Sequence, residues 1–280
     1  MRARLVPVWN VLKAWLLVAG GCAAVAGIAW PLGGYRLVSL LVFFALLVAF
    51  AAWWYGDRVV LGMVGARELP VGEAPALHAT VASLAGIAAL PKPKLYLLPD
   101  GLPRALAAGR GPRGAAIAVS SGLVAAAPPA ELAGILAHEL AHIRRRDIVV
   151  QTAAVIVAAA LLETSRVGGW LQRPLLFVLG PLAAAIVHLL LSPKREFAAD
   201  RAAAALCGSP HGLADALLRL DRAAELVQFR ASPATEPLYT FNPFAEEGLA
   251  ALFVTHPPVG ERIRRLRSLD PDWREKLRAA

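Results

Sequence analysis

The sequence contains very little cysteine. Its 280 residues include only Cys22, which lies inside an apolar run, and Cys207, and the two form no CxxC pair. This pattern argues against a disulfide framework and against a metal site built from thiolates. We expect both side chains to act as small apolar groups in a reducing compartment.

Charged residues are also scarce. They make up 18% of the chain, whereas hydrophobic residues make up 58% and the mean hydropathy is +0.56, above the range of an ordinary soluble domain. The charge that remains is unbalanced, at +9, which suits nucleic acid, a membrane surface or acidic substrates. No basic stretch is interleaved with aromatic residues as in RNA-binding proteins, so we expect no nucleic-acid partner. The apolar runs instead indicate a lipid bilayer.

Four apolar segments predict a multi-pass membrane protein. They cover residues 14–30, 37–55, 148–162 and 174–191. A spanning helix needs about 17–25 residues, so the third is short unless it extends through 164–170. The N-terminus, with Arg2 and Arg4 before its apolar run, could also be a signal peptide. Because a second apolar segment follows after only "PLGGYR", an uncleaved hairpin is favoured.

Basic residues flank the two hydrophobic hairpins on one side of the membrane. The short loops inside the hairpins hold only Arg36, Arg166 and Arg173. By the positive-inside rule, both termini and the large polar regions face the cytoplasm, in the inner membrane of the cell. The flanking residues are Arg2, Arg4, Lys13, Arg58, Arg67, Arg144, Arg145, Arg146, Lys194, Arg195 and Arg201.

This pattern divides the chain into four parts. Residues 1–56 form a transmembrane hairpin, 57–147 the first part of a catalytic domain, 148–192 a second hydrophobic hairpin, and 193–280 the second part of that domain. The expected fold is mainly α with a small β-sheet, of the α+β class.

The polar regions predict helices around two strands. A helix is expected over 74–90, strands over 94–100 and 115–121, and a mobile Gly/Pro-rich loop between the strands. A helix from residue 130 could continue into the third apolar segment. Further along, 194–227 looks helical with a break at 208–210, 229–248 forms a Pro-rich loop, and 260–271 begins as an amphipathic helix.

The string "HELAH" carries the clearest chemistry. On a helix, His138 and His142 lie on one face about 6 Å apart along the axis, so both imidazoles can reach one tetrahedral Zn²⁺. Glu139 cannot share that ligand plane, but it can take a proton from a metal-bound water. The alternative is a chance pattern, or two histidines satisfied by local hydrogen bonds.

The segment "EFAAD" supplies the other polar groups that such a site needs. Glu196 is the expected third zinc ligand, and Asp200, one turn later, is expected to accept a hydrogen bond from the far nitrogen of a ligand histidine. The two could instead form a solvated charge pair with Arg195 or Arg201. Both "HELAH" and "EFAAD" lie within about 10 Å of the ends of apolar segments, and these ends return to the same side of the membrane.

The chain resembles the HtpX-like membrane zinc endopeptidases, which are related to the CAAX prenyl endopeptidases. The resemblance rests on "HELAH", "LSPKREFAAD", "LPKPKLYLLPD", "AVSSGLV" and "LFVTHPPVGERIRRL", and it covers most of the chain. It implies a zincin-like domain of the gluzincin type, one zinc ion held by His138, His142 and Glu196, and Glu139 as the general base. It also implies that His256 steadies the oxyanion and that Arg262 pairs with an acidic partner to hold the ends of the catalytic domain together.

Two features of the resemblance leave alternatives open. "HPP" is also an ordinary turn, and Arg262 lies in a run of arginines that could simply be solvated.

Relatives commonly carry Asn-Ala-Phe after the first strand, where this chain has Arg104-Ala105-Leu106, which puts substrate preference in doubt. The strand at 115–121 could bind extended peptide by strand addition, or it could be a core strand.

The sequence therefore predicts a membrane-anchored zinc endopeptidase. It would cleave membrane-associated or misfolded proteins at the cytoplasmic membrane surface, as a form of protein quality control. One alternative is a prenyl-protein endopeptidase, against which the small number of apolar segments argues. Another is a membrane module that binds metal without catalysis, for which Glu139 would have no use. The natural substrates and the oligomeric state are not encoded in any motif.

Overall fold

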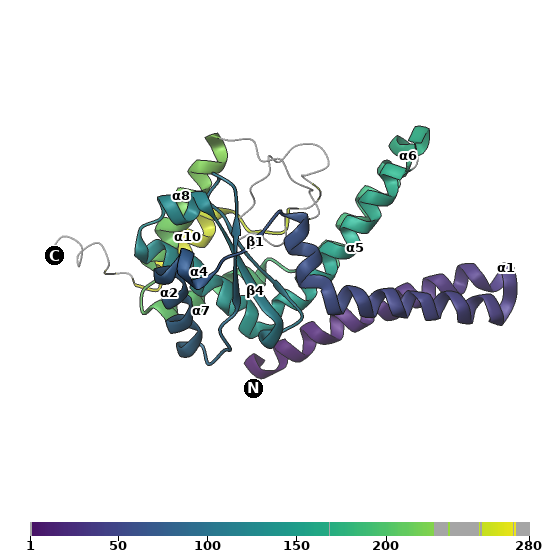
Figure 1. The fold of residues 1–280 in the computed structure, drawn as a ribbon, viewed down its shortest axis with the longest axis horizontal. Coiled ribbons are helices and arrows are strands. Elements are labelled where there is room, and N and C mark those ends of the chain that lie inside the picture. The colour runs from purple at the N-terminus through teal and green to yellow at the C-terminus, as the bar shows by residue number, and fades with distance from the viewer. Residues whose placement is uncertain are drawn as a thin grey trace.

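The structure is a computed structural model that describes residues 2–167, 169–226, 235, 252, 254–270 and 272. Figure 1 shows a body of helices around a small sheet, from which two helical arms project. Nearly all of the Pro-rich segment expected over 229–248 lies outside the described residues. The elements are α1 (Arg2–Met63), β1 (Arg67–Glu68), α2 (Pro75–Ile87), β2 (Lys94–Leu98), β3 (Ala105–Gly109), β4 (Ala115–Ser120), α3 (Ser121–Ala126), α4 (Pro129–Arg145), α5 (Asp147–Val167), α6 (Gln172–Leu190), α7 (Lys194–Cys207), α8 (His211–Leu226) and α10 (Val259–Arg267).

The first arm is α1, which two glycines break in the middle. Gly33 and Gly34 have non-helical backbone angles, and Gly34 has φ 58° and ψ −154°, a combination that only glycine adopts readily. The chain turns back there as a helical hairpin (Figure 1). The most apolar 18-residue window of α1 is 0% buried in the protein. A helix with such a surface is stable only in lipid.

The sheet contains a strand that the sequence did not predict. Its order is β1-β2-β4-β3, in which β2 pairs with β4 in parallel and the other two pairs are antiparallel. The segment expected to be a mobile loop forms β3, which was hidden because alanine has a low preference for strands. The strand-addition hypothesis for 115–121 is wrong, since β4 is hydrogen-bonded to a neighbouring strand on both sides.

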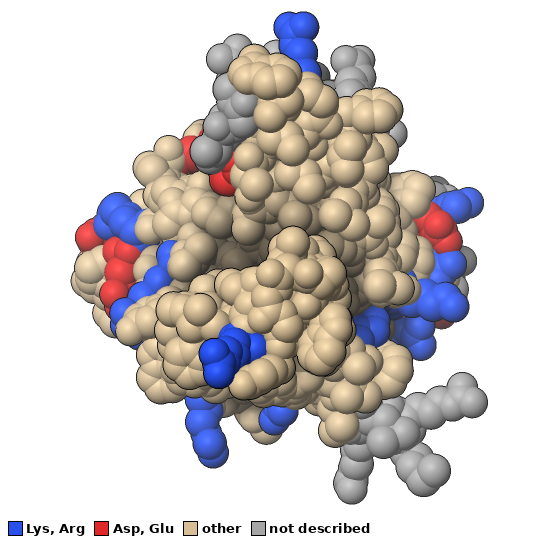
Figure 2. All heavy atoms as spheres, turned by 90° about the vertical axis from the view of Figure 1, so that its right-hand side faces the viewer, with Lys and Arg blue, Asp and Glu red and all other residues tan. Residues whose placement is uncertain are grey.

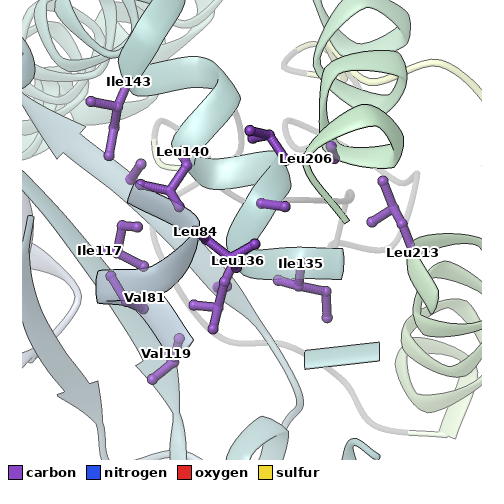
Figure 3. Packing of buried hydrophobic residues seen from close by; sticks show 14 of the residues in the cluster. Val81, Leu84, Ile117, Val119, Ile135, Leu136, Leu140, Ile143, Leu206 and Leu213 are labelled. Carbon is purple, nitrogen blue, oxygen red and sulfur yellow. The ribbon is translucent and has the colours of Figure 1, made fainter. Parts of the chain in front are cut away.

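Helices cover both faces of the sheet. Ile117 and Val119 of β4 belong to the main core with residues of α2 and α4, whereas Ala116 and Ala118 pack with the end of α1 and with Val155 of α5. Figure 3 shows the main core gathered along α4, with Leu206 of α7 and Leu213 of α8 also close to this helix. The alternation of β4 side chains explains why all six of its residues are buried.

A sharp turn separates α4 from α5. The expected continuation of this helix into the apolar segment is wrong, because Arg146 adopts the left-handed conformation with φ 58° and ends α4. Its backbone N–H donates to carbonyls of the last turn, those of His142 and Ile143. The apolar helix α5 then starts in a new direction at Asp147.

The second arm consists of α5 and α6. Their contact surface is built from small and aliphatic side chains such as Ala154, Ala158 and Ala183, which allow close helix packing in a membrane. The most apolar window of α5 is 61% buried, against 28% for α6, because α5 also packs on the sheet. Figure 2 views the molecule from the side of the arms, whose surface is almost uncharged, with basic residues around its edge.

Candidate metal centre

Two histidine nitrogens meet on the buried face of α4. The Nε2 atoms of His138 and His142 lie 3.1 Å apart, and both side chains are almost fully buried. The Glu196 carboxylate comes from the first turn of α7, with its Oε2 atom 3.4 Å from His138 Nε2 and 3.6 Å from His142 Nε2. The structure thus brings together the three residues expected as metal ligands.

The dimensions of this triangle fit a metal ion. The point equidistant from the three atoms in their plane lies about 2.0 Å from each of them. Zn–N and Zn–O bonds are about 2.0–2.2 Å long, so one ion placed slightly out of this plane reaches all three atoms at ordinary distances. Neither oxygen of the fully buried Glu196 accepts a well-formed hydrogen bond from the described residues. Arg195 Nε, 3.1 Å from Oε1, balances part of the carboxylate charge. A metal ion would bind Oε2, which faces both histidine nitrogens.

Asp147 supports His142 from behind, a role that the sequence analysis missed. The Oδ2 atom of Asp147 lies 3.0 Å from His142 Nδ1, so the ring donates through Nδ1 and leaves Nε2 to a metal. Arg145 Nε donates to the same oxygen over 3.0 Å, and Asn10 Nδ2 of α1 donates to Oδ1 over 2.6 Å. The available signal was a single carboxylate directly after three arginines, at the start of an apolar segment.

Asp200 supports His138 in the same way, and Arg262 holds Asp200. The Asp200 Oδ1 atom lies 3.0 Å from His138 Nδ1. The fully buried guanidinium of Arg262 donates to both carboxylate oxygens, over 2.9 Å and 2.7 Å. The pairing of Arg262 with an acid was expected from the resemblance, and through it α10 is joined to α7 beside the centre.

The remaining two expected residues also lie at the centre. Glu139 is 2% exposed and follows His138 on α4. His256 directly precedes the turn into α10, and its Nε2 atom is 3.7 Å from Glu196 Oε2. A third imidazole therefore approaches the same carboxylate oxygen as the two α4 histidines.

The charges at the centre shift the pKa values of its ionisable groups. Burial would lower the pKa of His142, but the carboxylates of Glu196 and Asp147 outweigh it and raise the pKa to about 9. Burial would raise the pKa of Glu196, yet the positive charges of His256, His142 and Arg195 hold it well below its usual value. For Asp200, the ion pair with Arg262 outweighs burial and lowers the pKa to about 2. The carboxylates are therefore ionised and ready to bind a cation.

The other histidines and Arg104 have local partners. His78 bonds to the backbone oxygen of Leu69, and His211 pairs with Asp270. The buried Arg104 forms an ion pair of 2.5 Å with Asp100. His188 is within 2.9 Å of a backbone oxygen of Leu252.

The chain is similar to known proteins over almost its whole length. Residues 72–270 match the family model described as peptidase family M48. A protease HtpX homolog of Persephonella marina is 40% identical over 255 residues, which are 84% of this chain and 88% of that protein. The corresponding protein of Pelotomaculum thermopropionicum is 37% identical and covers 93% of this chain and 99% of its own length. A crystal structure of S. mikatae Ste24p superposes with a TM-score of 0.49 at 17% identity, over 95% of this chain and 66% of that one.

Proposed function

This chain belongs to peptidase family M48 and is a membrane-bound metalloendopeptidase, and from this premise we propose that it is a zinc enzyme that cleaves proteins at the cytoplasmic membrane surface. The observation that carries the proposal is the buried triangle of His138, His142 and Glu196, with Glu139 beside it. A site that only stabilised the fold would be closed by a fourth protein ligand. The described residues supply three ligands and an acid that can act as a base.

The donor set supports zinc in particular. Two imidazoles and one carboxylate are the ligands of many hydrolytic zinc sites, and they leave one position for water. Zinc bound there would polarise the scissile carbonyl and lower the pKa of its water. Asp147 and Asp200 would hold His142 and His138 with the metal-facing nitrogen unprotonated.

The other residues would then move protons and balance charge. Glu139 would accept a proton from the attacking water and pass it to the leaving amine. The imidazole of His256 would donate a hydrogen bond to the negative oxygen that develops on the substrate carbonyl. Arg262 would act mainly through Asp200, to which it makes two hydrogen bonds, and its guanidinium also lies 3.9 Å from Glu196 Oε2.

The position of the centre supports substrates at the membrane. One residue separates α4 from the apolar helix α5, and three residues separate α6 from α7. The centre is thus built directly on the ends of the second arm. Membrane-associated or misfolded proteins that reach this surface are the substrates that such a placement favours, on the cytoplasmic side if the basic residues near the helix ends set the orientation.

A single substitution tests the mechanism. Glu139→Gln should keep the zinc content of the purified protein but lower proteolysis of casein, and self-cleavage in detergent, by at least about 100-fold, the scale of a lost general base. Glu68→Gln, at an exposed position on β1, is the control and should retain both properties. Full proteolysis by Glu139→Gln would refute the assigned mechanism.

A further inference from the structure

Parts of five helices line a pocket behind the proposed metal centre. This pocket has a volume of about 250 Å³ and is lined by the start of α1, the junction of α4 and α5, the end of α6 and the start of α7. Two hydrogen bonds fix its walls. Lys13 Nζ donates to the backbone oxygen of Leu190 over 2.9 Å, and Asn10 Nδ2 donates to that of Arg145 over 3.1 Å.

The lining of the pocket is strongly basic. Lys13, Arg145, Lys194 and Arg195 line it, against a single acid, Asp147. That acid is 4% exposed and already bonded to His142, Arg145 and Asn10. Arg145 is paired with Asp147, and Arg195 Nε lies 3.1 Å from Glu196 Oε1. Lys13 and Lys194 therefore give the pocket its net positive charge, for which a bound anion would compensate.

The pocket also has an apolar side at the level of the membrane surface. Val6, Val150 and Leu190 line it together with Trp9, which is 54% exposed. Asp147 begins the apolar helix α5, Leu190 ends α6, and Lys13 directly precedes the apolar run 14–30 within α1. The hydrogen bonds across the pocket hold these three positions close together. Basic residues and tryptophan at the ends of spanning helices mark the depth of lipid headgroups.

We propose that this pocket binds the phosphate-bearing headgroup of an anionic phospholipid. Lys13 and Lys194 would contact the phosphate, with Trp9 at the same headgroup level and Arg145 and Arg195 adding positive charge, while Val150 and Leu190 would contact the glycerol and the first acyl carbons. A free phosphate would use only the charged half of this lining, whereas a lipid uses both halves. The proposal depends on membrane insertion and not on proteolysis.

A bound headgroup would lie next to Asp147, the residue that orients His142 in the proposed metal site. Arg145 and Asp147 both line the pocket, and Asp147 holds His142 through its Oδ2 atom. The lipid would therefore contact residues that are one hydrogen bond away from a proposed metal ligand.

The experiment measures lipid binding to the full-length protein in detergent. It uses the Glu139→Gln background to suppress self-cleavage, and it counts lipid bound to chains of intact mass only, so that a failure of the catalytic proposal does not change the result. Native mass spectrometry would follow titrations with phosphatidylglycerol, phosphatidylcholine and inorganic phosphate. We expect phosphatidylglycerol to bind at least tenfold more tightly than phosphatidylcholine.

Two lysine variants locate the site. Lys194→Gln should weaken phosphatidylglycerol binding about fivefold, the effect of one cation near a lipid surface, and Lys13→Gln should do the same. The Lys194 side chain is exposed, so its loss leaves the packing intact. Lys13→Gln also removes the bond to Leu190, and Lys13→Arg should restore binding. Lys92→Gln, on the exposed turn before β2, is the control and should leave binding unchanged.

Three results would overturn the proposal. Equal affinity for the two lipids would show that charge is not recognised. Equal weakening by Lys92→Gln and Lys194→Gln would show a general surface effect. Displacement of the lipid by inorganic phosphate at the lipid's own concentration would identify the pocket as a site for a free anion.

Discussion

Two aspartates give the metal centre its rigidity at the scale of single residues. Asp147 contacts the outer nitrogen of His142, and Asp200 contacts that of His138. Each aspartate fixes the orientation of one ring and selects its tautomer. They differ in their own support, because Asp200 is held by the buried Arg262 and Asp147 by Asn10 and Arg145.

Removing either carboxylate charge should weaken metal binding. We expect Asp147→Asn and Asp200→Asn each to lower zinc affinity by about 10–100-fold, the usual effect of losing a partner of a ligand histidine. Zinc competition with a chromophoric chelator measures this change. Asp215→Asn, on the exposed face of α8, should leave the affinity unaltered, and an unchanged affinity in both test variants would contradict the assigned support.

Asp200→Asn should also destabilise the fold more than Asp147→Asn does. It removes the hydrogen-bonded anionic partner of the fully buried Arg262, and the loss of one partner of a buried ion pair costs about 3–5 kcal/mol. The arginine paired with Asp147 is Arg145, whose side chain is 24% exposed and remains partly solvated without it. Thermal denaturation followed by circular dichroism would separate the two variants, and equal melting temperatures would argue against this difference.

Zinc affinity should fall as the pH falls below about 9. Without metal, the pKa of His142 is raised to about 9, so the ring is protonated at neutral pH. A metal binds only the neutral imidazole, and binding therefore releases a proton. The apparent affinity should drop about tenfold for each pH unit below 9, since one proton competes with the metal. Chelator competition between pH 7 and 9 measures the slope, and a flat profile would contradict the raised pKa.

At the scale of elements, the junction of α4 and α5 contains a strained backbone conformation. Arg146 is one of two residues other than glycine with positive φ in the described part of the chain. This conformation costs a non-glycine residue about 1–2 kcal/mol. The left-handed conformation of Arg146 turns the chain from α4, which carries the two histidines, into the apolar helix α5. The strained residue is therefore what allows the two helices to run in different directions.

Arg146→Gly should therefore stabilise the protein. The gain of about 1 kcal/mol corresponds to a rise of about 2–4 °C in melting temperature. Arg144→Gly, two residues earlier and inside α4, removes the same charge but should lower stability by about 1 kcal/mol, because glycine weakens a helix interior. If both variants shifted the melting temperature in the same direction, the strain at Arg146 would be disproved.

The elements with strong periodic patterns were predicted from the sequence, and those set by tertiary contacts were not. The helix expected over 74–90 is α2, and the Gly-Gly break of the first hairpin lies where "PLGGYR" indicated it. β3 was missed because "ALAAG" has no pattern of its own and becomes a strand by pairing with β4. The end of α4 was missed because Arg146 carries no local turn signal.

The metal centre was predicted more completely than its surroundings. The spacing of "HELAH" and "EFAAD" was enough to select the residues that the structure brings within 4.8 Å of one another. Asp147 was not predicted because the turn at Arg146, which directs its carboxylate back to His142, was not expected. Asn10 was not predicted because its contact with Asp147 joins residues 137 positions apart. Such contacts depend on where α1 packs, and no short motif encodes that position.

At the scale of the whole molecule, the membrane arms and the catalytic body share a helix. α5 packs on α6 with one face and on the sheet and the end of α1 with another. Arg110 adds a second connection, since it donates to the backbone oxygen of Trp54 and lies 4.2 Å over its ring. The body therefore has a fixed orientation relative to the membrane.

Cysteine labelling tests that orientation. In a chain whose two natural cysteines are replaced by alanine, Arg36→Cys at the hairpin tip should react with an impermeant maleimide in intact cells. Lys92→Cys in the body should react only after the cells are permeabilised, if the body lies on the cytoplasmic side as the positive-inside rule predicts. Labelling of Lys92→Cys in intact cells would show the opposite topology.

Because the proposed metal ligands lie in distant segments, they are not synthesised at the same time. The chain is synthesised from its N-terminus, and Glu196 follows His142 by 54 residues, with the whole second arm between them. At about 5–20 residues per second, the third proposed ligand emerges roughly 3–10 s after the second. Arg262, which anchors Asp200, comes later still. An unfinished chain on the ribosome therefore has no complete centre, and it cannot cut its neighbours before its own second arm has been made.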